Sequence, residues 1–156
     1  MVAWRYRIAG HAMRLYARAR RPRTFGVRAL LVDPAGRIAL VRHHYVGGWY
    51  LPGGGVDKRE SAEAAIRREL IEEVGLAAVA ITGVLGVYHN RAEAKDDHVI
   101  VFTVGVADPE RLTAADPREI AEAGWFAADA LPEGTSPATR RRITEFLAGE
   151  QGHGNW

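Results

Sequence analysis

The chain has 156 residues, 47% of them hydrophobic, which suits one domain with a substantial core. It contains no cysteine, so disulfides, zinc–thiolate sites and cysteine nucleophiles are excluded, and we expect a reducing, cytoplasmic location. The formal net charge is +2, but residues 1–26 carry seven arginines and no acid, which leaves −5 on the rest of the chain.

The arginine-rich start is predicted to be a basic helical extension, residues 1–23, built around an amphipathic helix over residues 3–20. Its apolar residues fall near one side: Trp4, Ile8, Ala12, Leu15 and Tyr16. No run of about 18 apolar residues occurs anywhere, so we expect no membrane span, and the apolar core of a signal peptide is missing. We favour packing on the domain or on a homodimer partner. RNA binding, an anionic membrane surface and mitochondrial targeting stay open.

Two strands are predicted next, over Val27–Val32 and Ile38–His43, joined by a type I turn at residues 33–36. His43 and His44 have no acidic neighbour in sequence. We therefore interpret them as sheet-edge or pocket residues rather than metal ligands.

A glycine-rich loop precedes the longest predicted helix of the domain, with three consecutive glycines after Pro52: Gly53, Gly54 and Gly55. Glycine backbone approaches a ligand closely, and amide groups that lead into a helix N-terminus favour phosphate. We take these glycines as candidate substrate-binding residues, together with Arg42 and Trp49. Trp49 either stacks on a base or packs beneath the loop, and packing is the safer interpretation.

The helix after the loop is predicted to begin after Ser61, a suitable N-cap, and to end at Gly75, a suitable C-cap. Its apolar residues recur at helical spacing and form one stripe that faces a core: Ile66, Leu70 and Val74.

Three acids share an adjacent stripe of this helix: Glu69, Glu72 and Glu73. Exposed like charges at these spacings repel by roughly 0.2–0.5 kcal/mol per pair, an effect that Arg68 offsets in part. Alone, the pattern is typical of a solvated acidic face. Beside a phosphate-binding loop it indicates a Mg²⁺ site for chemistry on a diphosphate.

The fixed positions of this stretch resemble the signature box of the Nudix hydrolases: Gly54, Glu60 and Arg68–Leu76 (RELIEEVGL). The box covers 23 of the 156 residues, from Gly54 to Leu76. The sequence departs from the common family pattern at one variable position, where it has Arg59 and many members have glycine.

The resemblance implies hydrolysis of a nucleoside diphosphate linked to another group, with Mg²⁺ or Mn²⁺. The three helix glutamates and the Gly54 carbonyl would bind metal ions that activate a water molecule. Glu69 could accept the proton of that water, and Arg68 would orient the glutamates. Glu60 would tie the loop to the helix.

The remaining predicted elements are three strands, a helix and a tail: Ala80–Tyr88, Val99–Val106, Glu122–Phe126, Pro137–Leu147 and a frayed Gln151–Trp156. A polar, mobile loop is expected between His89 and Asp97. The Nudix domain would span residues 24–150.

An additional acid outside the box is expected from the resemblance, as a catalytic residue and metal ligand. Glu119 is the choice, because it lies six residues before Trp125, a spacing that resembles the oxidised-nucleotide pyrophosphatases. Glu122 is the reserve.

The substrate is predicted by elimination within the family. The next proline after Pro52 is Pro109, and Tyr88 comes early, so the marks of ADP-ribose and dinucleoside-polyphosphate members are absent. The coenzyme A motif is not evident. A nucleoside triphosphate is therefore the expected substrate. An RNA 5′-end pyrophosphohydrolase, an RNA-binding protein and a non-catalytic nucleotide sensor are the alternatives, although a sensor usually has a degraded box.

The expected fold is α/β, a Nudix-type α/β/α sandwich with a mixed central sheet. The box helix would cover one face and the C-terminal helix the other.

Overall fold

The computed structural model describes residues 24–91 and 96–156. The predicted basic extension therefore lies outside the described residues. Within the described ranges, nine elements follow in chain order: β1 (Thr24–Val32), β2 (Ile38–His43), α2 (Ala62–Val74), β3 (Val79–Asn90), β4 (Asp97–Val106), η2 (Pro109–Arg111), β5 (Ile120–Phe126), α3 (Pro137–Leu147) and β6 (Gly152–Asn155).

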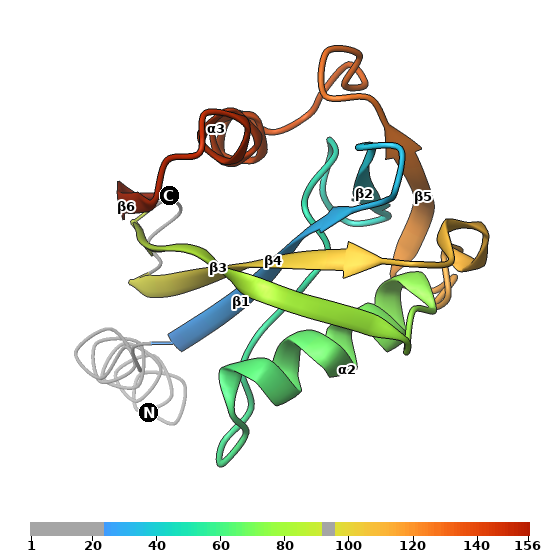
Figure 1. Cartoon of the computed structure of the whole chain (residues 1–156). Coiled ribbons are helices and arrows are strands. Elements are labelled where there is room, and N and C mark those ends of the chain that lie inside the picture. The colour runs from blue at the N-terminus through green and yellow to red at the C-terminus, as the bar shows by residue number, and fades with distance from the viewer. Residues whose placement is uncertain (1–23, 92–95) are drawn as a thin grey trace, which may run out of the picture.

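The strands form one six-stranded mixed sheet in the order β5-β2-β1-β4-β3-β6. The β1–β4 and β3–β6 pairs are parallel, and the other neighbours are antiparallel. Helix α2 lies on one face of the sheet and α3 on the other (Figure 1). The expected α/β/α sandwich is confirmed, and each helix covers its own cluster of buried apolar side chains. None of the helices in the described ranges is long and apolar enough to cross a membrane.

Strands β1 and β2 separate after their turn, and the glycine-rich loop fills the space between them. Only Val32 and Ile38 pair directly. The loop instead accepts hydrogen bonds from β1, where the Val27 amide donates to the Gly54 carbonyl at 2.8 Å. Gly53 has a φ of 133°, and a Cβ there would collide with the Val27 carbonyl oxygen. Only glycine lets the loop lie this close to the strand.

Helix α2 begins and ends where its capping residues predict. The Ser61 side chain accepts a hydrogen bond from the Ala64 amide, and Gly75 is left-handed with a φ of 71°. The predicted apolar stripe is buried. Glu73, expected beside the stripe, is buried as well, because α2 packs that edge against the glycine-rich loop.

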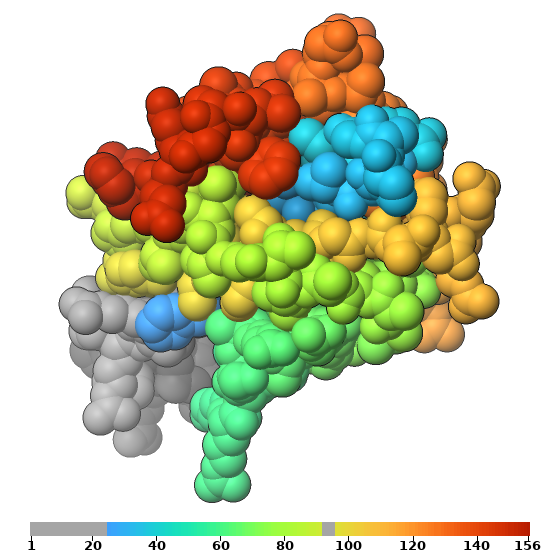
Figure 2. All heavy atoms as spheres, in the orientation of Figure 1, coloured from blue at the N-terminus to red at the C-terminus, as the bar shows by residue number. Residues whose placement is uncertain are grey.

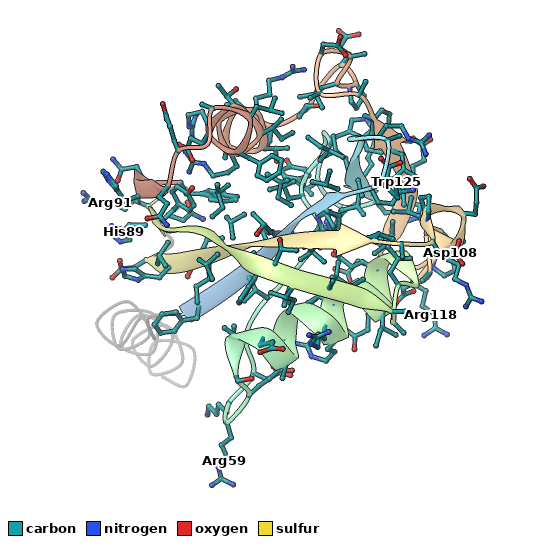
Figure 3. The ribbon with its side chains drawn as sticks, in the orientation of Figure 1. Arg59, His89, Arg91, Asp108, Arg118 and Trp125 are labelled. Atoms are coloured by element: carbon teal, nitrogen blue, oxygen red, sulfur yellow. The ribbon has the colours of Figure 1, made fainter. Side chains whose placement is uncertain are left out.

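The turn before α2 projects from the body of the molecule, with Arg59 at its tip (Figures 2 and 3). Arg59 has a φ of 67°, the only described non-glycine residue with positive φ. The position where many family members have glycine therefore keeps the left-handed backbone although the side chain is arginine.

The C-terminal residues are ordered, which corrects the prediction that residues 151–156 fray. They form β6, which pairs in parallel with β3 from Gly86↔Gly152 to His89↔Asn155. The Trp156 ring lies edge-on to Tyr88, with a centroid distance of 6.0 Å. Glycines and polar residues dominate this tail, so its local pattern gives no strand signal, and its partner strand is distant in sequence.

Candidate active site

Arg68 lies at the centre of the polar contacts between the loop and helix α2. It donates to both Glu60 carboxylate oxygens at 2.9 Å, to Glu69 at 2.8 Å and to Glu72 at 3.1 Å. It also donates to the Gly55 carbonyl at 3.0 Å. The hydrogen bonds from Arg68 lower the pKa of Glu60 to about 2. One guanidinium thus holds three carboxylates and the loop in place.

Glu73 points inward from α2 and contacts the loop backbone. Its Oε2 accepts a hydrogen bond from the Gly53 amide at 2.7 Å, and its side chain is only 5% exposed. Burial raises the pKa of Glu73 to about 7, against the opposing effects of the Gly53 hydrogen bond and of Arg28. A cation beside this carboxylate would favour its ionised form.

The other two helix glutamates differ in exposure. Burial raises the pKa of Glu69, although Arg68 opposes the shift. A Cβ at Gly54 would lie 2.5 Å from Glu69 Oε1, so the loop glycine makes room for this carboxylate. Glu72 is exposed, at 55%.

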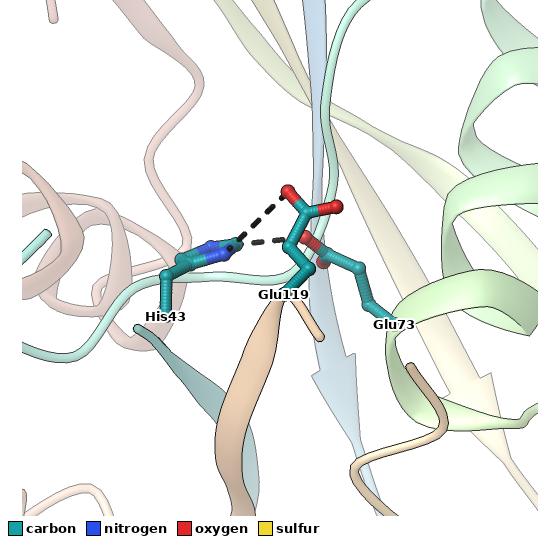
Figure 4. A group of neighbouring side chains, drawn as sticks. All are labelled: His43, Glu73 and Glu119. Atoms are coloured by element: carbon teal, nitrogen blue, oxygen red, sulfur yellow. Dashed lines mark ion pairs between the residues drawn. The ribbon is translucent and has the colours of Figure 1, made fainter. Parts of the chain in front are cut away.

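Glu119 lies beside Glu73, although 46 positions separate them in the sequence. One ligand atom from each of Glu119, Glu73 and His43 falls within 4.8 Å of the others (Figure 4). The β2–β5 pairing explains the placement, because His43 faces Ile120 and the His44 amide donates to the Glu119 carbonyl at 3.0 Å.

Glu122, the reserve acid, lies elsewhere. It pairs with Arg42 across β2 and β5 at 2.7 Å, and both side chains are about half exposed. Arg42 also lies 5.9 Å from the Trp49 ring, which packs edge-on against Phe126 at 5.0 Å. This supports packing for Trp49. Among the described residues, no hydrogen bond or ion pair joins Arg42 or Trp49 to the three helix glutamates.

The Gly54 carbonyl, expected to bind metal, accepts the Val27 amide in the sheet and has one remaining lone pair. The neighbouring loop carbonyls are held by Arg28 of β1. Its guanidinium donates to the Leu51 carbonyl at 3.1 Å and also to the Gly53 carbonyl.

Sequence reasoning missed two residues of this site, Arg28 and Tyr45, and it named His43 only as a sheet-edge or pocket residue. His43 is 7% exposed, and burial lowers its pKa, which favours the neutral imidazole. Tyr45 is 71% exposed, and its hydroxyl donates to Glu119 at 2.7 Å. Partial desolvation of the hydroxyl together with this contact raises the tyrosine pKa to about 12. The available signal was position, because His43 ends strand β2 and Tyr45 follows it by two residues, on the segment that leads to the glycine-rich loop.

A cleft of about 1280 Å³ opens from Arg28 and His43 toward the start of α3. Its lining combines cationic and aromatic side chains: Arg28, Arg91, Arg141, Tyr45, Tyr50 and Trp156. Arginines favour phosphate, and aromatic rings favour the face of a base. The lining of the cleft therefore suits an anionic ligand that carries an aromatic ring, and His43 and Tyr45 connect the cleft to Glu119.

The family model described as the NUDIX domain matches residues 22–147. The chain belongs to the Nudix family. This Nudix protein is 36% identical to a Bacillus subtilis (strain 168) protein provisionally named 8-oxo-dGTP diphosphatase, over 82% of this chain and 83% of that one. It is 43% identical over 60 residues to an RNA pyrophosphohydrolase of Caulobacter vibrioides (strain NA1000 / CB15N), which covers 36% of this chain and 35% of that one.

Solved structures of related Nudix proteins share its fold. The MutT Nudix hydrolase from Burkholderia pseudomallei superposes with a TM-score of 0.64 at 30% identity, covering 78% of this chain and 95% of that one. The MutT protein from Methanosarcina mazei Go1 gives 0.70 at 26% identity, covering 82% and 95%. The chain is thus a Nudix hydrolase that acts on phosphoric anhydrides.

Nudix hydrolases generally depend on a divalent metal ion, and the residues of this site fit one. Carboxylate oxygens of Glu69, Glu72, Glu73 and Glu119 are hard ligands of the kind that Mg²⁺ and Mn²⁺ take. Glu73 and Glu119 already lie close enough together to share an ion.

Proposed function

We propose that this Nudix hydrolase converts nucleoside triphosphates to nucleoside monophosphates and pyrophosphate. The observation that carries the proposal is the position of Glu119. It comes from β5 and joins the box residue Glu73 beside a cleft rich in arginine and aromatic side chains. The Bacillus subtilis relative supports a nucleoside triphosphate, because its name specifies one and the similarity spans 83% of that protein.

The protein groups divide into binding and positioning roles. Arg28 lines the cleft and lies where the phosphates would enter. Arg68 fixes Glu69 and Glu72 by hydrogen bonds, and the Gly53 amide fixes Glu73. Preorganised groups of this kind need no rearrangement when the substrate arrives.

The metal ion that we propose, Mg²⁺ or Mn²⁺, would neutralise diphosphate charge and lower the pKa of a bound water. Glu69, Glu72, Glu73 and Glu119 would hold it, with the Gly54 carbonyl as a further oxygen. In the reaction, a water oxygen bonds to phosphorus, the anhydride P–O bond breaks, and the proton of the water passes to a carboxylate.

Glu69 is our candidate for that proton acceptor. It is partly buried, and burial raises the pKa of its carboxyl in the metal-free chain. A carboxylate positioned beside the attacking water can accept its proton. Arg68 holds one of its oxygens, so the carboxylate has a fixed direction.

A second candidate substrate is the 5′-triphosphate end of RNA. The match to an RNA pyrophosphohydrolase covers 36% of this chain, and the cleft extends to Arg91 and Arg141, where further nucleotides could bind. The similarity to the Bacillus subtilis protein, which spans 82% of this chain, weighs more in our assignment than this partial match.

The test is a Mg²⁺-dependent screen with identification of the products. Substrates are the nucleoside triphosphates including 8-oxo-dGTP, ADP-ribose, nucleotide sugars, dinucleoside polyphosphates and 5′-triphosphorylated RNA. We expect a triphosphate to give the highest kcat/KM, with pyrophosphate as product. Higher kcat/KM on RNA than on every free triphosphate would replace our assignment with the second candidate.

A further inference from the structure

His43 occupies an unusual environment for a histidine that merely fills space. It is 7% exposed, and its Nδ1 is buried without a hydrogen-bond partner among the described residues. An unpaired buried nitrogen is costly, so it calls for a missing partner. The candidates on the protein are too far away: His43 Nδ1 lies 3.8 Å from Glu119 Oε1, and Nε2 lies 3.7 Å from Glu73 Oε1.

Both separations are too long for hydrogen bonds, and they involve different ring nitrogens, of which only one can face a given ion. Ligand atoms that each lie about 2.0–2.2 Å from a metal are roughly 3–4 Å from one another. One ligand atom of each residue falls within 4.8 Å of the other two, and Figure 4 shows both carboxylates directed at the ring.

Both carboxylates are already held in place by other groups. Glu73 Oε2 accepts the Gly53 amide, so the oxygen that faces His43 is the other one, Oε1. Glu119 accepts the Tyr45 hydroxyl at 2.7 Å and keeps further lone pairs. Outer partners of this kind orient metal ligands in proteins.

The local charge also favours a cation. With both glutamates ionised and Arg28 as the neighbouring guanidinium, the group has a net negative charge, and His43 adds a nitrogen donor without adding charge. Arg28 is held on the Leu51 and Gly53 carbonyls.

We propose that His43, Glu73 and Glu119 form a mixed nitrogen–oxygen site for a first-row transition-metal ion, which it binds in preference to Mg²⁺. Imidazole suits such ions, whereas Mg²⁺ takes oxygen ligands. The inference deepens the proposed function, because Glu73 and Glu119 belong to the proposed active site. It adds that one metal position there is selective, and that the selectivity comes from His43.

The test measures metal binding by the full chain without nucleotide. Calorimetric titrations with Co²⁺ and Mg²⁺ compare the native protein with His43→Gln. We expect His43→Gln to weaken Co²⁺ binding at least about tenfold, the lower range for loss of a group that supports a metal site. Mg²⁺ binding should change little. The matched control is His44→Gln, which alters the exposed neighbouring histidine and should leave both affinities unchanged.

A spectroscopic readout separates a ligand from a merely structural histidine. Pulsed electron paramagnetic resonance of the Mn²⁺ complex should show nitrogen coupling in the native protein and in His44→Gln, and none in His43→Gln. Absence of nitrogen coupling in the native complex overturns the proposal, as does equal loss of Co²⁺ and Mg²⁺ affinity in His43→Gln. Neither measurement requires turnover. A protein that shows the coupling but does not hydrolyse triphosphates would refute the proposed substrate and leave this site standing.

Discussion

Burial gives Glu73 a pKa of about 7 in the folded protein, above the ordinary value of 4.5. The folded state therefore binds this proton more tightly than the unfolded chain. In metal-free protein, the free energy of unfolding should therefore fall as pH rises from about 4.5 to about 7. Ionisation of Glu73 alone should lower it by up to about 3 kcal/mol.

Glu73→Gln should remove that loss while nearly abolishing turnover. Its midpoint of thermal unfolding at pH 8 without metal should exceed that of the native protein, because no charge remains to be buried. Activity with saturating Mg²⁺ should fall by a factor of at least about 10². Glu63→Gln is the control, since Glu63 is an exposed glutamate of the same helix that pairs with Arg67 at 3.0 Å. Near-native turnover in Glu73→Gln would remove the residue from the proposed metal site.

Arg59 offers a test of backbone strain. A non-glycine residue in the left-handed region costs roughly 1–2 kcal/mol, and glycine loses more chain entropy on folding by roughly 0.5–1 kcal/mol. Arg59→Gly, at a φ of 67°, should therefore raise the free energy of unfolding by up to about 1 kcal/mol. Chemical denaturation measures the change. Arg59→Ala keeps the Cβ and should give no gain, so equal stabilisation by both substitutions would contradict the strain account.

At the scale of elements, α2 shows what local sequence determines. Its ends follow from Ser61 and Gly75, and its buried stripe follows from helical spacing, so all three were predictable. The burial of Glu73 was not, because it depends on the Gly53 amide of a loop wedged between two strands. The acidic surroundings of His43 were not predictable for a similar reason, because Glu73 and Glu119 are close to it only in the folded chain.

Strand β6 was unpredictable from local pattern, because contacts distant in sequence stabilise it. The Arg142 guanidinium lies 3.8 Å from the Tyr88 ring centroid, donates to the Asn155 carbonyl at 3.2 Å and pairs with Glu145 at 2.7 Å. The Tyr88 hydroxyl donates to the same Glu145 at 2.7 Å. Trp156 borders this group on the cleft side.

Trp156→Ala should destabilise the domain by about 1–3 kcal/mol, less than a fully buried tryptophan because the ring is only partly covered. Urea denaturation measures the effect, and His153→Ala, an exposed residue in β6 three positions before Trp156, should change stability by less than about 0.5 kcal/mol. Equal, small effects of the two substitutions would indicate that β6 adds little stability.

At the scale of the whole molecule, the α/β/α sandwich and its mixed sheet followed from the family resemblance. The order of strands in the sheet brings the site together, because β5 lies next to β2 and so places Glu119 beside the residues at the end of β2. The arginines of residues 1–23 would favour RNA over a free nucleoside triphosphate as the substrate if they bind nucleic acid.

Deleting residues 1–23 tests that segment. If its arginines serve packing or solubility, kcat/KM on a nucleoside triphosphate should stay within about twofold of the native value. An RNA role would show as RNA binding that weakens steeply with salt and disappears on deletion. Salt-insensitive binding of every RNA tested would exclude that role.

In our proposed mechanism, Glu119 works with the box glutamates although it lies outside the box. The most direct test compares kcat and KM of Glu119→Gln and Glu122→Gln for triphosphate hydrolysis at saturating Mg²⁺. Because Glu119 lies beside His43 and Glu73 whereas Glu122 pairs with Arg42, only Glu119→Gln should depress kcat, by about 10²–10⁴-fold with little change in KM. Near-native kcat in Glu119→Gln, or a larger loss in Glu122→Gln, would contradict the account.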